Sequence, residues 1–512
     1  MPYNIQGADD EIAFDGNVSF RGGVNSVSRP SMLNEDEVSD LVNMVIDPVG
    51  RVVTRAGCTY PTNTPGNNVV RGMQYFDTST SEFLMVSANG ALYAWDGALR
   101  QTVSGFSSGG GVNISMAQFG GKLYVTNGTN VYEWDGNISN AASTVANTPA
   151  CSLMCAHAGR MFYLTGTDTI LPSNLNNPAT TGWLSFRIGQ GEGSEIVGWQ
   201  PWHNNILVVL KRNSIYMLDA SPVNPTGAVV TSSAEFPIEL ISPGIGCVAG
   251  KSIASVGNDV YFLSDDGVRS VARTQSEKQV GTSPPLSTPI QPLIDRINWA
   301  YANTACATHH NNRYMLAVPL DSATSPNCLL VMNVLTGKWE GCWTGWQPVE
   351  FCETFFAGRR KLHFGGIDGK VGEFLDWKPE TAMSDTDYTD SGTPIQSSLT
   401  TRSYTHGSML HLKTGFGLVV DFSRSLALAS IDILQDEGAP QRLWSGATSL
   451  GSVRLPVFLP FMLPKSGPRR VLSDMLSNGQ HREVQLRISS TGGKLAVASS
   501  GVEAFVDSIE NH

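Results

Sequence analysis

A hairpin unit that recurs through the first three quarters of this 512-residue chain constrains its fold more than any other feature. Residues 83–97 (FLMVSANGALYAWDG) and residues 119–136 (FGGKLYVTNGTNVYEWDG) show the unit most clearly. Each has a β-rich run, an Asn-Gly turn, a second alternating run and a closing Trp-Asp-Gly. The two tryptophans, Trp95 and Trp134, lie 134 − 95 = 39 positions apart. One such unit cannot bury both of its faces, so several units must stack to form a core.

The turns and the spacing of the units indicate a β-propeller. Asn89-Gly90 and Asn127-Gly128 are strong signals for tight hairpin turns, whose central residues need positive φ. Looser copies of the unit lie at residues 155–165, 197–219, 253–271, 305–339 and 353–377. The seven units recur about every 45 residues, the period of four-stranded propeller blades. We therefore expect a mainly β protein with about seven blades, six to eight being possible, and with both repeat tryptophans buried.

Three regions fall outside the repeat. Residues 31–46 carry apolar residues at helical spacing behind a capping residue, which predicts a short helix. Residues 289–300 show a second helical spacing, and we expect this inserted segment to contact another subunit through its apolar face. From about residue 378, a Ser/Thr/Asp-rich stretch leads into alternating strands that are typical of a small β-sandwich.

These regions predict four parts of the chain. We expect an N-terminal opening strand and short helix at residues 1–57, which pack on or close the propeller; the propeller itself at residues 58–377, with a helical insertion near 289–300; a linker at residues 378–392; and a C-terminal β-sandwich-like domain at residues 393–512.

Charge and cysteine content narrow the class of protein. The chain has 34 Lys+Arg against 45 Asp+Glu, a net charge of −11, which argues against nucleic-acid binding across the outer surface. No stretch approaches the roughly 18 apolar residues of a membrane span, and the N-terminus lacks the pattern of a secretory signal. The eight cysteines are scattered and form no C-x-x-C pair. We expect buried free thiols and assembly in a reducing cytoplasm.

Few residues suggest chemistry, and no phosphate-binding loop, zinc-protease motif or nucleophile elbow is present. His309-His310 could bind a metal, but no further ligand recurs at a suitable spacing, so exposed loop histidines are the simpler interpretation. Asp265-Asp266-Gly267 loosely resembles the Asp-box of sialidase propellers. It occurs once and lacks the rest of that motif, which favours a hairpin turn.

Two further sets of residues could in principle form a catalytic or a sugar-binding site. Asp9-Asp10, and Glu35 with Glu37, could serve as acid and base only if a pocket separated their pKa values; solvated carboxylates need less assumption. The tryptophans 339, 343 and 346 could stack sugars, but aromatic side chains at such positions more often pack in a core. We expect no catalytic residue, no cofactor-binding residue and no metal ligand, and hence a protein that is not an enzyme.

The most distinctive sequence pattern lies between residues 18 and 57. It places Gly22-Gly23 and Asn25 before Asn43, Asp47, Gly50 and Arg55-Ala56-Gly57. This GG-x-N … N … D … G … R-x-G order is followed by LY-x-WDG at residues 92–97 and VY-x-WDG at residues 131–136. The pattern resembles the tail nozzle (tail tubular) β-propeller proteins of short-tailed bacteriophages. The resemblance covers about residues 18–377, and the C-terminal part departs from it most.

The resemblance implies a structural protein of the virion tail. Such proteins form a ring, usually a hexamer, below the portal and adaptor proteins, contact tail fibre or spike proteins, and build the distal channel for DNA ejection. Double-stranded DNA would pass without specific binding, and an acidic wall is compatible with this because like charge repels phosphates. The alternative is a tail protein that binds or cleaves carbohydrate on the host surface.

Overall fold

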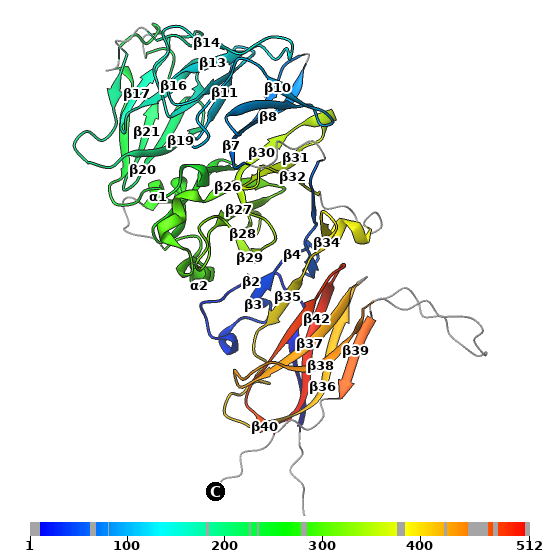
Figure 1. The fold of residues 1–512 in the computed structure, drawn as a ribbon. Helices are drawn as coiled ribbons and strands as arrows, with labels where there is room; N and C mark the ends of the chain where they lie inside the picture. The colour runs from blue at the N-terminus through cyan, green and yellow to red at the C-terminus, as the bar shows by residue number, and fades with distance from the viewer. Residues whose placement is uncertain are drawn as a thin grey trace, which may run out of the picture.

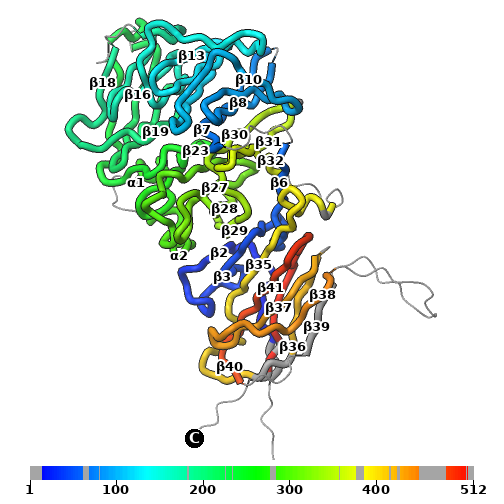
Figure 2. Tube along the Cα trace, in the orientation of Figure 1, coloured from blue at the N-terminus to red at the C-terminus, as the bar shows by residue number. Residues whose placement is uncertain are grey.

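The protein consists of two β lobes, a propeller and a sandwich, with strands from both ends of the chain between them (Figures 1 and 2). The computed structural model describes residues 11–61, 68–79, 81–180, 184–224, 227–232, 235–277, 284–375, 384–423, 427–448, 469–474 and 480–506. Within these residues the chain is mainly β, and the expected fold class, a propeller with a small helical insertion and a C-terminal sandwich-like domain, is confirmed.

The first four blades are separate four-stranded antiparallel sheets. Blade 1 contains β7 (Val70–Asp77), β8 (Glu82–Ala88), β9 (Ala91–Trp95) and β10 (Arg100–Val103). Blade 2 contains β11 (Ser115–Phe119), β12 (Lys122–Thr126), β13 (Val131–Trp134) and β14 (Ser143–Thr144). Blade 3 contains β15 (Leu153–His157), β16 (Arg160–Thr165), β17 (Thr169–Pro172) and β18 (Phe186–Arg187). Blade 4 contains β19 (Ile196–Trp202), β20 (Ile206–Lys211), β21 (Ile215–Asp219) and β22 (Ile238–Ser242).

The last three blades carry the short helices. Blade 5 contains η3 (Gly250–Ser252), β23 (Ala254–Val256), β24 (Asp259–Ser264), β25 (Gly267–Ser270) and then α1 (Val271–Glu277). Blade 6 follows η4 (Thr288–Ile290), α2 (Gln291–Asp295) and η5 (Trp299–Thr304), and contains β26 (Cys306–His310), β27 (Arg313–Val318), β28 (Cys328–Asn333) and β29 (Lys338–Trp343). Blade 7 contains β30 (Pro348–Thr354), η6 (Phe356–Gly358), β31 (Lys361–Gly366), β32 (Val371–Phe374) and β6 (Cys58–Thr59).

The blades close into a ring through their first strands. β7 contacts β11, β11 contacts β15, and β23 contacts both β19 and β26. Blades 3 and 4 share a hydrophobic cluster that includes Phe162 and Trp199. Finally β26 contacts β30, and β30 contacts β7. The outer strand of blade 7 comes from the segment that precedes blade 1. Thr59 of β6 pairs with Glu373, and Cys58 pairs with Phe374. Seven blades therefore form the propeller in the described part of the chain.

The sandwich is built from two sheets. One contains β1 (Glu11–Asn17), β4 (Met44–Ile46), β5 (Val52–Thr54), β36 (Lys413–Phe422), β39 (Arg469–Asp474), β40 (Gln480–His481) and β42 (Ala496–Val506). The other contains β2 (Gly23–Val24), β3 (Glu37–Val42), β35 (Ser397–Thr401), β37 (Leu428–Gln435), β38 (Gln441–Ala447) and β41 (Val484–Ser490), and continues from blade 6. η1 (Pro30–Met32) precedes β3. η8 (Asp385–Tyr388) precedes β33 (Thr389–Asp390) and β34 (Thr393–Pro394), which extend the sheet of blade 7.

The helix predicted for residues 31–46 is wrong. This stretch contains η1 and the strands β3 and β4, and β3 pairs with β35. A register shift between Val38 and Asp40 places an extra residue in β3, so Val38 and Leu41 are both buried although they lie three positions apart. The bulge thus imitates helical spacing, and the left-handed Asn43 (φ 55°) then separates β3 from β4.

The helical insertion near 289–300 forms, but its apolar face does not point to another subunit. Only Gln291–Asp295 are α-helical, flanked by 3₁₀ turns. Ile290, Ile294 and Ile297 are buried in the chain's own core, in the cluster that also holds Val318 and Leu320. The expectation of a subunit contact through this face is therefore wrong, since blade 6 already covers it.

The predicted domain bounds stay a prediction, but strand pairing shows that the ends of the chain serve both lobes. β1 and β5 pair with β42, and β3 pairs with β35, so most of residues 11–54 belongs to the sandwich. Within the stretch predicted as a linker, Asp390 of β33 pairs with Cys58 of β6 and extends blade 7.

Candidate functional site at the junction of the lobes

The distinctive residues between 18 and 57 meet where the propeller joins the sandwich. Gly23 has φ +76°, and a Cβ there would lie 2.8 Å from the carbonyl oxygen of Trp339 in blade 6. A Cβ at Gly57 would overlap the carbonyl group of Thr389. The glycines of this motif therefore allow the N-terminal backbone to lie directly against segments that are far away in the sequence.

Arg55 is the centre of the junction, and its side chain is 0% exposed. Its Nη1 and Nη2 donate to the two carboxylate oxygens of Asp390, at 3.0 and 2.7 Å. Nε donates to Asn43 Oδ1 (3.0 Å), and Nη2 also donates to the Thr344 carbonyl oxygen (2.8 Å). The guanidinium carbon lies 3.8 Å from the ring centroid of Trp346. A bidentate pair with this much support fixes the positions of all its members.

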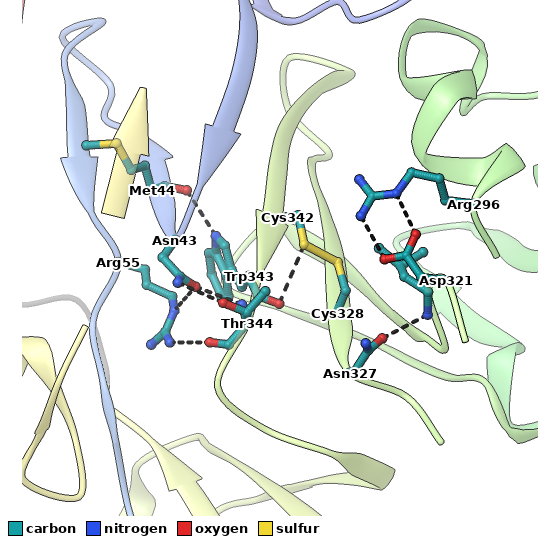
Figure 3. Close-up of a disulfide and its surroundings, with 11 residues drawn as sticks. Asn43, Met44, Arg55, Arg296, Asp321, Asn327, Cys328, Cys342, Trp343 and Thr344 are labelled. Atoms are coloured by element: carbon teal, nitrogen blue, oxygen red, sulfur yellow. Dashed lines mark hydrogen bonds and ion pairs between the residues drawn. A yellow bond between two sulfur atoms is a disulfide. The ribbon is translucent and has the colours of Figure 1, made fainter. Parts of the chain in front are cut away.

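Asn43 connects the same group to the sandwich. Its Nδ2 donates to Thr344 Oγ1 (3.0 Å) and to the Gln396 carbonyl oxygen (2.8 Å), and its Oδ1 accepts from the Thr344 N–H (2.8 Å). Figure 3 shows Asn43, Arg55 and Thr344 turned toward one another. The network therefore joins the N-terminal segment, the link between blades 6 and 7, and the start of β35. Its members bind one another, so its role is to hold the lobes together.

Asp47 and Gly50 close the turn between β4 and β5 beside this network. Asp47 Oδ1 accepts hydrogen bonds from the Val49 and Arg51 backbone N–H groups at 3.0 and 2.9 Å, and Gly50 has φ +96°. Asp390 was missed by the sequence reasoning, because it lies in a polar stretch that reads as a linker. Its only signal is a carboxylate in a stretch without apolar periodicity.

The three tryptophans considered for sugar stacking are buried, and the expectation that they pack in a core is confirmed. Each indole N–H donates within the protein: Trp339 to the Leu286 carbonyl oxygen, Trp343 to the Met44 carbonyl oxygen and Trp346 to Cys58 Sγ, all at 2.9 Å. Burial raises the pKa of the Cys58 thiol to about 12, so it is a protonated partner of the junction.

The repeat tryptophans are buried as predicted, with Trp95 8% and Trp134 1% exposed. The following aspartate and glycine form the turn in both units: Asp96 accepts from the Leu99 N–H, Asp135 accepts from the Asn137 N–H, and Gly97 and Gly136 have φ +95° and +84°.

The two Asn-Gly turns differ from each other. Asn89 (φ 54°) and Gly90 (φ 75°) form the tight hairpin turn that was predicted. Asn127 instead accepts two backbone N–H groups in a four-residue connection between β12 and β13, so the predicted hairpin forms there through a longer turn. Its side chain closes the turn locally and competes with the tight form.

Cys328 and Cys342 form a disulfide between β28 and β29, with their Cα atoms 6.1 Å apart (Figure 3). The expectation of free thiols throughout is wrong for this pair. The antiparallel pairing of β28 and β29 brings the two cysteines together, and no sequence motif predicts that these two strands pair. The cysteines at 58, 151, 155, 247, 306 and 352 are free.

The candidate histidines do not lie in an exposed loop, so that expectation is wrong. His309 and His310 end β26, because Asn311 (φ 47°) and Asn312 (φ 60°) form the tight turn that follows. His310 is 6% exposed and its Nδ1 lies 2.5 Å from Glu353 Oε1, while burial lowers the pKa of His309. In the described residues no group of three or more His, Cys, Asp or Glu side chains could hold a metal ion.

The acidic candidates are not brought together. Asp265 and Asp266 form the turn of a hairpin, as favoured, because Ser264 pairs with Gly267; Asp265 binds Arg212 at 2.6 Å. Glu37 is buried and accepts from the Asn34 N–H at 3.0 Å, whereas Glu35 is exposed. Asp9-Asp10 lies outside the described residues.

Lys251 of η3 links the inner strands of two neighbouring blades, β30 of blade 7 and β7 of blade 1. Its Nζ lies 2.7 Å from Glu350 Oε2 on β30 and 3.5 Å from the Arg71 carbonyl oxygen on β7. The short helix itself contacts β19 and β26. Lys251 and its helix therefore reach the inner strands of blades 1, 4, 6 and 7, and no sequence signal marks this residue.

Residues 49–280 match the family model described as "Bacteriophage P22 Gp10, beta-propeller". No curated protein matches the chain. Structurally similar proteins include BBS1N in complex with ARL6DN (12% identity, TM-score 0.41, 63% of this chain and 98% of that chain). BamB from Moraxella catarrhalis is another (11% identity, TM-score 0.38, 63% of this chain and 100% of that chain).

The family match confirms, over these residues, the resemblance to phage tail β-propeller proteins. Among the described residues, no helix has the length and hydropathy needed to cross a bilayer.

Proposed function

We propose, from the match of residues 49–280 to the bacteriophage P22 Gp10 β-propeller family, that this chain is the subunit of a tail nozzle ring. Several copies, six by the resemblance, assemble below the portal and adaptor proteins. DNA leaves the virion through the opening that the copies surround. Tail fibre or spike proteins bind the outside of the same ring.

The contacts among the inner strands support a channel between copies rather than within one copy. Inner strands of neighbouring blades contact one another, and the Lys251–Glu350 pair (2.7 Å) bridges η3 and β30 among them. Duplex DNA, whose major groove alone is wide enough to admit an α-helix, cannot pass through a space that side chains bridge. A DNA conduit built from this chain therefore needs a ring of several propellers.

The junction and the charge of the chain suit such a ring. The buried Arg55–Asp390 pair and the strands shared between lobes hold the sandwich in place against the propeller. The net charge of −11 allows a wall that repels phosphates, so that DNA slides instead of binding. The burial of Trp339, Trp343 and Trp346 takes these three rings away from solvent, which counts against the carbohydrate alternative.

The experiment is to measure the assembly state of the full chain by mass photometry and negative-stain microscopy, alone and mixed with purified portal–adaptor complex. We expect closed rings of one copy number in at least one of the two samples. Antibody labelling of an epitope tag on the chain should mark the distal end of intact tails. A chain that stays monomeric in both samples and is missing from purified virions would overturn the proposal.

A further inference from the structure

A groove of about 830 Å³ lies between blade 6 and the β4–β5 turn. One wall is formed by Asp47 and Pro48 of that turn. The opposite wall is formed by two turns of blade 6, at residues 311–312 and 335–336. This groove lies beside the junction but uses different side chains, and the proposed ring does not require it.

The rim of the groove carries an excess of positive charge. Arg21, Lys338 and Arg360 line it, and all three are exposed. Arg21 donates to a backbone carbonyl oxygen, that of Pro48 (2.8 Å), and Arg360 Nε is 3.7 Å from Glu353. The Lys338 ammonium group has no hydrogen bond or ion pair with the described residues.

The acids of the groove do not neutralise this rim. Asp47 and Glu340 are 5% and 1% exposed, and each is already paired with an arginine. Asp47 lies 2.6 Å from Arg51, and Glu340 lies 2.6 Å from Arg313. Arg21 and Lys338 therefore face solvent without an ion pair to the described acids, and Arg360 has only the 3.7 Å pair with Glu353, in a chain whose net charge is −11. A ligand of this groove must be anionic.

A smaller, apolar recess adjoins the groove. It measures about 70 Å³ and shares Val45, Asn311 and Arg313 with the groove. Met315 and Trp343 line its inner part. At the mouth, Leu335 is 75% exposed. A ligand therefore gains by burying an aliphatic side chain in the recess while its charged groups stay at the rim.

We propose that this groove binds an acidic peptide segment that carries an aliphatic residue, contributed by another protein of the tail. The basic rim recognises the carboxylates, and the recess recognises the aliphatic side chain. Nucleic acid shares the negative charge but is the poorer match. Single strands bind to exposed aromatic faces, whereas Trp343 is 7% exposed and its ring packs within the core.

The test uses the full chain and a short fluorescein-labelled peptide of repeated Asp-Glu-Leu, with binding followed by fluorescence anisotropy. A peptide with Lys in place of the acids, a peptide with Ser in place of Leu, and single-stranded DNA of similar length are the comparison probes. The double variant Lys338→Glu/Arg360→Glu reverses the charge at two positions of the rim. Arg29→Glu/Arg482→Glu is the matched control, since it changes the net charge equally at exposed arginines outside the groove.

We expect the rim variant to weaken binding of the acidic peptide at least tenfold and the control variant to change it less than twofold. The Lys peptide should not bind, and the Ser peptide should bind several-fold more weakly. Equal binding to the rim and control variants would overturn the proposal, as would DNA binding more tightly than the acidic peptide in a rim-dependent way. If the rim variant melts early, Lys338→Gln and Arg360→Gln separately provide the same comparison.

Discussion

Blade 2 and the sandwich are both antiparallel β structures, but they are assembled in opposite ways. All strands of blade 2 come from residues 115–144, and each pairs with the strand before or after it. In the sandwich, Asn17 pairs with Ser500 and Val53 pairs with Ala496. A blade thus closes through local turns, whereas the sandwich closes only when the two ends of the chain meet.

The difference predicts where stability depends on distant parts of the sequence. A blade loses little if a residue elsewhere changes, because its hairpins are complete in themselves. The sandwich and blade 7 depend on β1, β3, β5 and β6, which come from the first 59 residues. Contacts of such sequence separation form against a large loop-closure entropy and need strong local interactions to hold them.

The largest expected effect comes from removing the junction arginine. Arg55→Leu leaves the Asp390 carboxylate, 14% exposed, without its partner, and the free energy of unfolding should fall by about 3–5 kcal/mol. Urea unfolding followed by tryptophan fluorescence measures the change. The matched control is Lys122→Leu, which removes a local pair with Glu133 (3.0 Å) inside blade 2.

That control pair is 44% and 29% exposed, so its loss should cost below about 1 kcal/mol. Equal losses in the two variants would show that the distant pair stabilises no more than the local one. The comparison between the two regions would then not extend to their energetics.

The same difference explains what the sequence could predict. The propeller and its blade number follow from local signals: Asn89-Gly90, the Trp-Asp-Gly turns, and alternation within each hairpin. The strand β3 could not be recognised, because its bulge places Val38 and Leu41 on one face at helical spacing. The Arg55 network and the Cys328–Cys342 bridge could not be found either, since each requires a pairing register that no nearby residue specifies.

A smaller loss of stability should distinguish Gly57 from Gly121, because the two positions require glycine for different physical reasons. Gly57 has a negative or extended φ but lies against the Thr389 carbonyl group, so Gly57→Ala forces two distant segments apart. Gly121 has φ +76° and open space around its missing Cβ. We expect losses of about 2–3 kcal/mol for Gly57→Ala, from overpacking, and about 1 kcal/mol for Gly121→Ala, from backbone conformation alone.

Thermal unfolding of both variants and of the unmodified chain tests this order. If Gly121→Ala lowered the midpoint as much as Gly57→Ala, the close approach at the junction would contribute nothing beyond ordinary turn strain.

The smallest expected effect is a pH dependence of stability at the pairing of β32 with β6. Glu373 of β32 pairs through its backbone with Thr59 of β6. Burial alone would raise the pKa of its carboxyl group, but the nearby His363 ring (3.4 Å) and the hydrogen bond from Lys361 outweigh burial, and the pKa is lowered. A lowered folded-state pKa gives stability that is present above the unfolded pKa, about 4.3, and is lost as the pH falls through the folded value.

Glu373→Gln should therefore destabilise the protein most near neutral pH, and the difference from the unmodified chain should shrink below about pH 4. Thermal midpoints across this range measure it. Because Lys361 Nζ lies 2.6 Å from Glu373 Oε1, the same substitution in a Lys361→Met background should show a weaker dependence on pH. A pH-independent difference in both backgrounds would mean that β32 is held to β6 by backbone pairing alone, and that charge adds nothing where the distant strand completes blade 7.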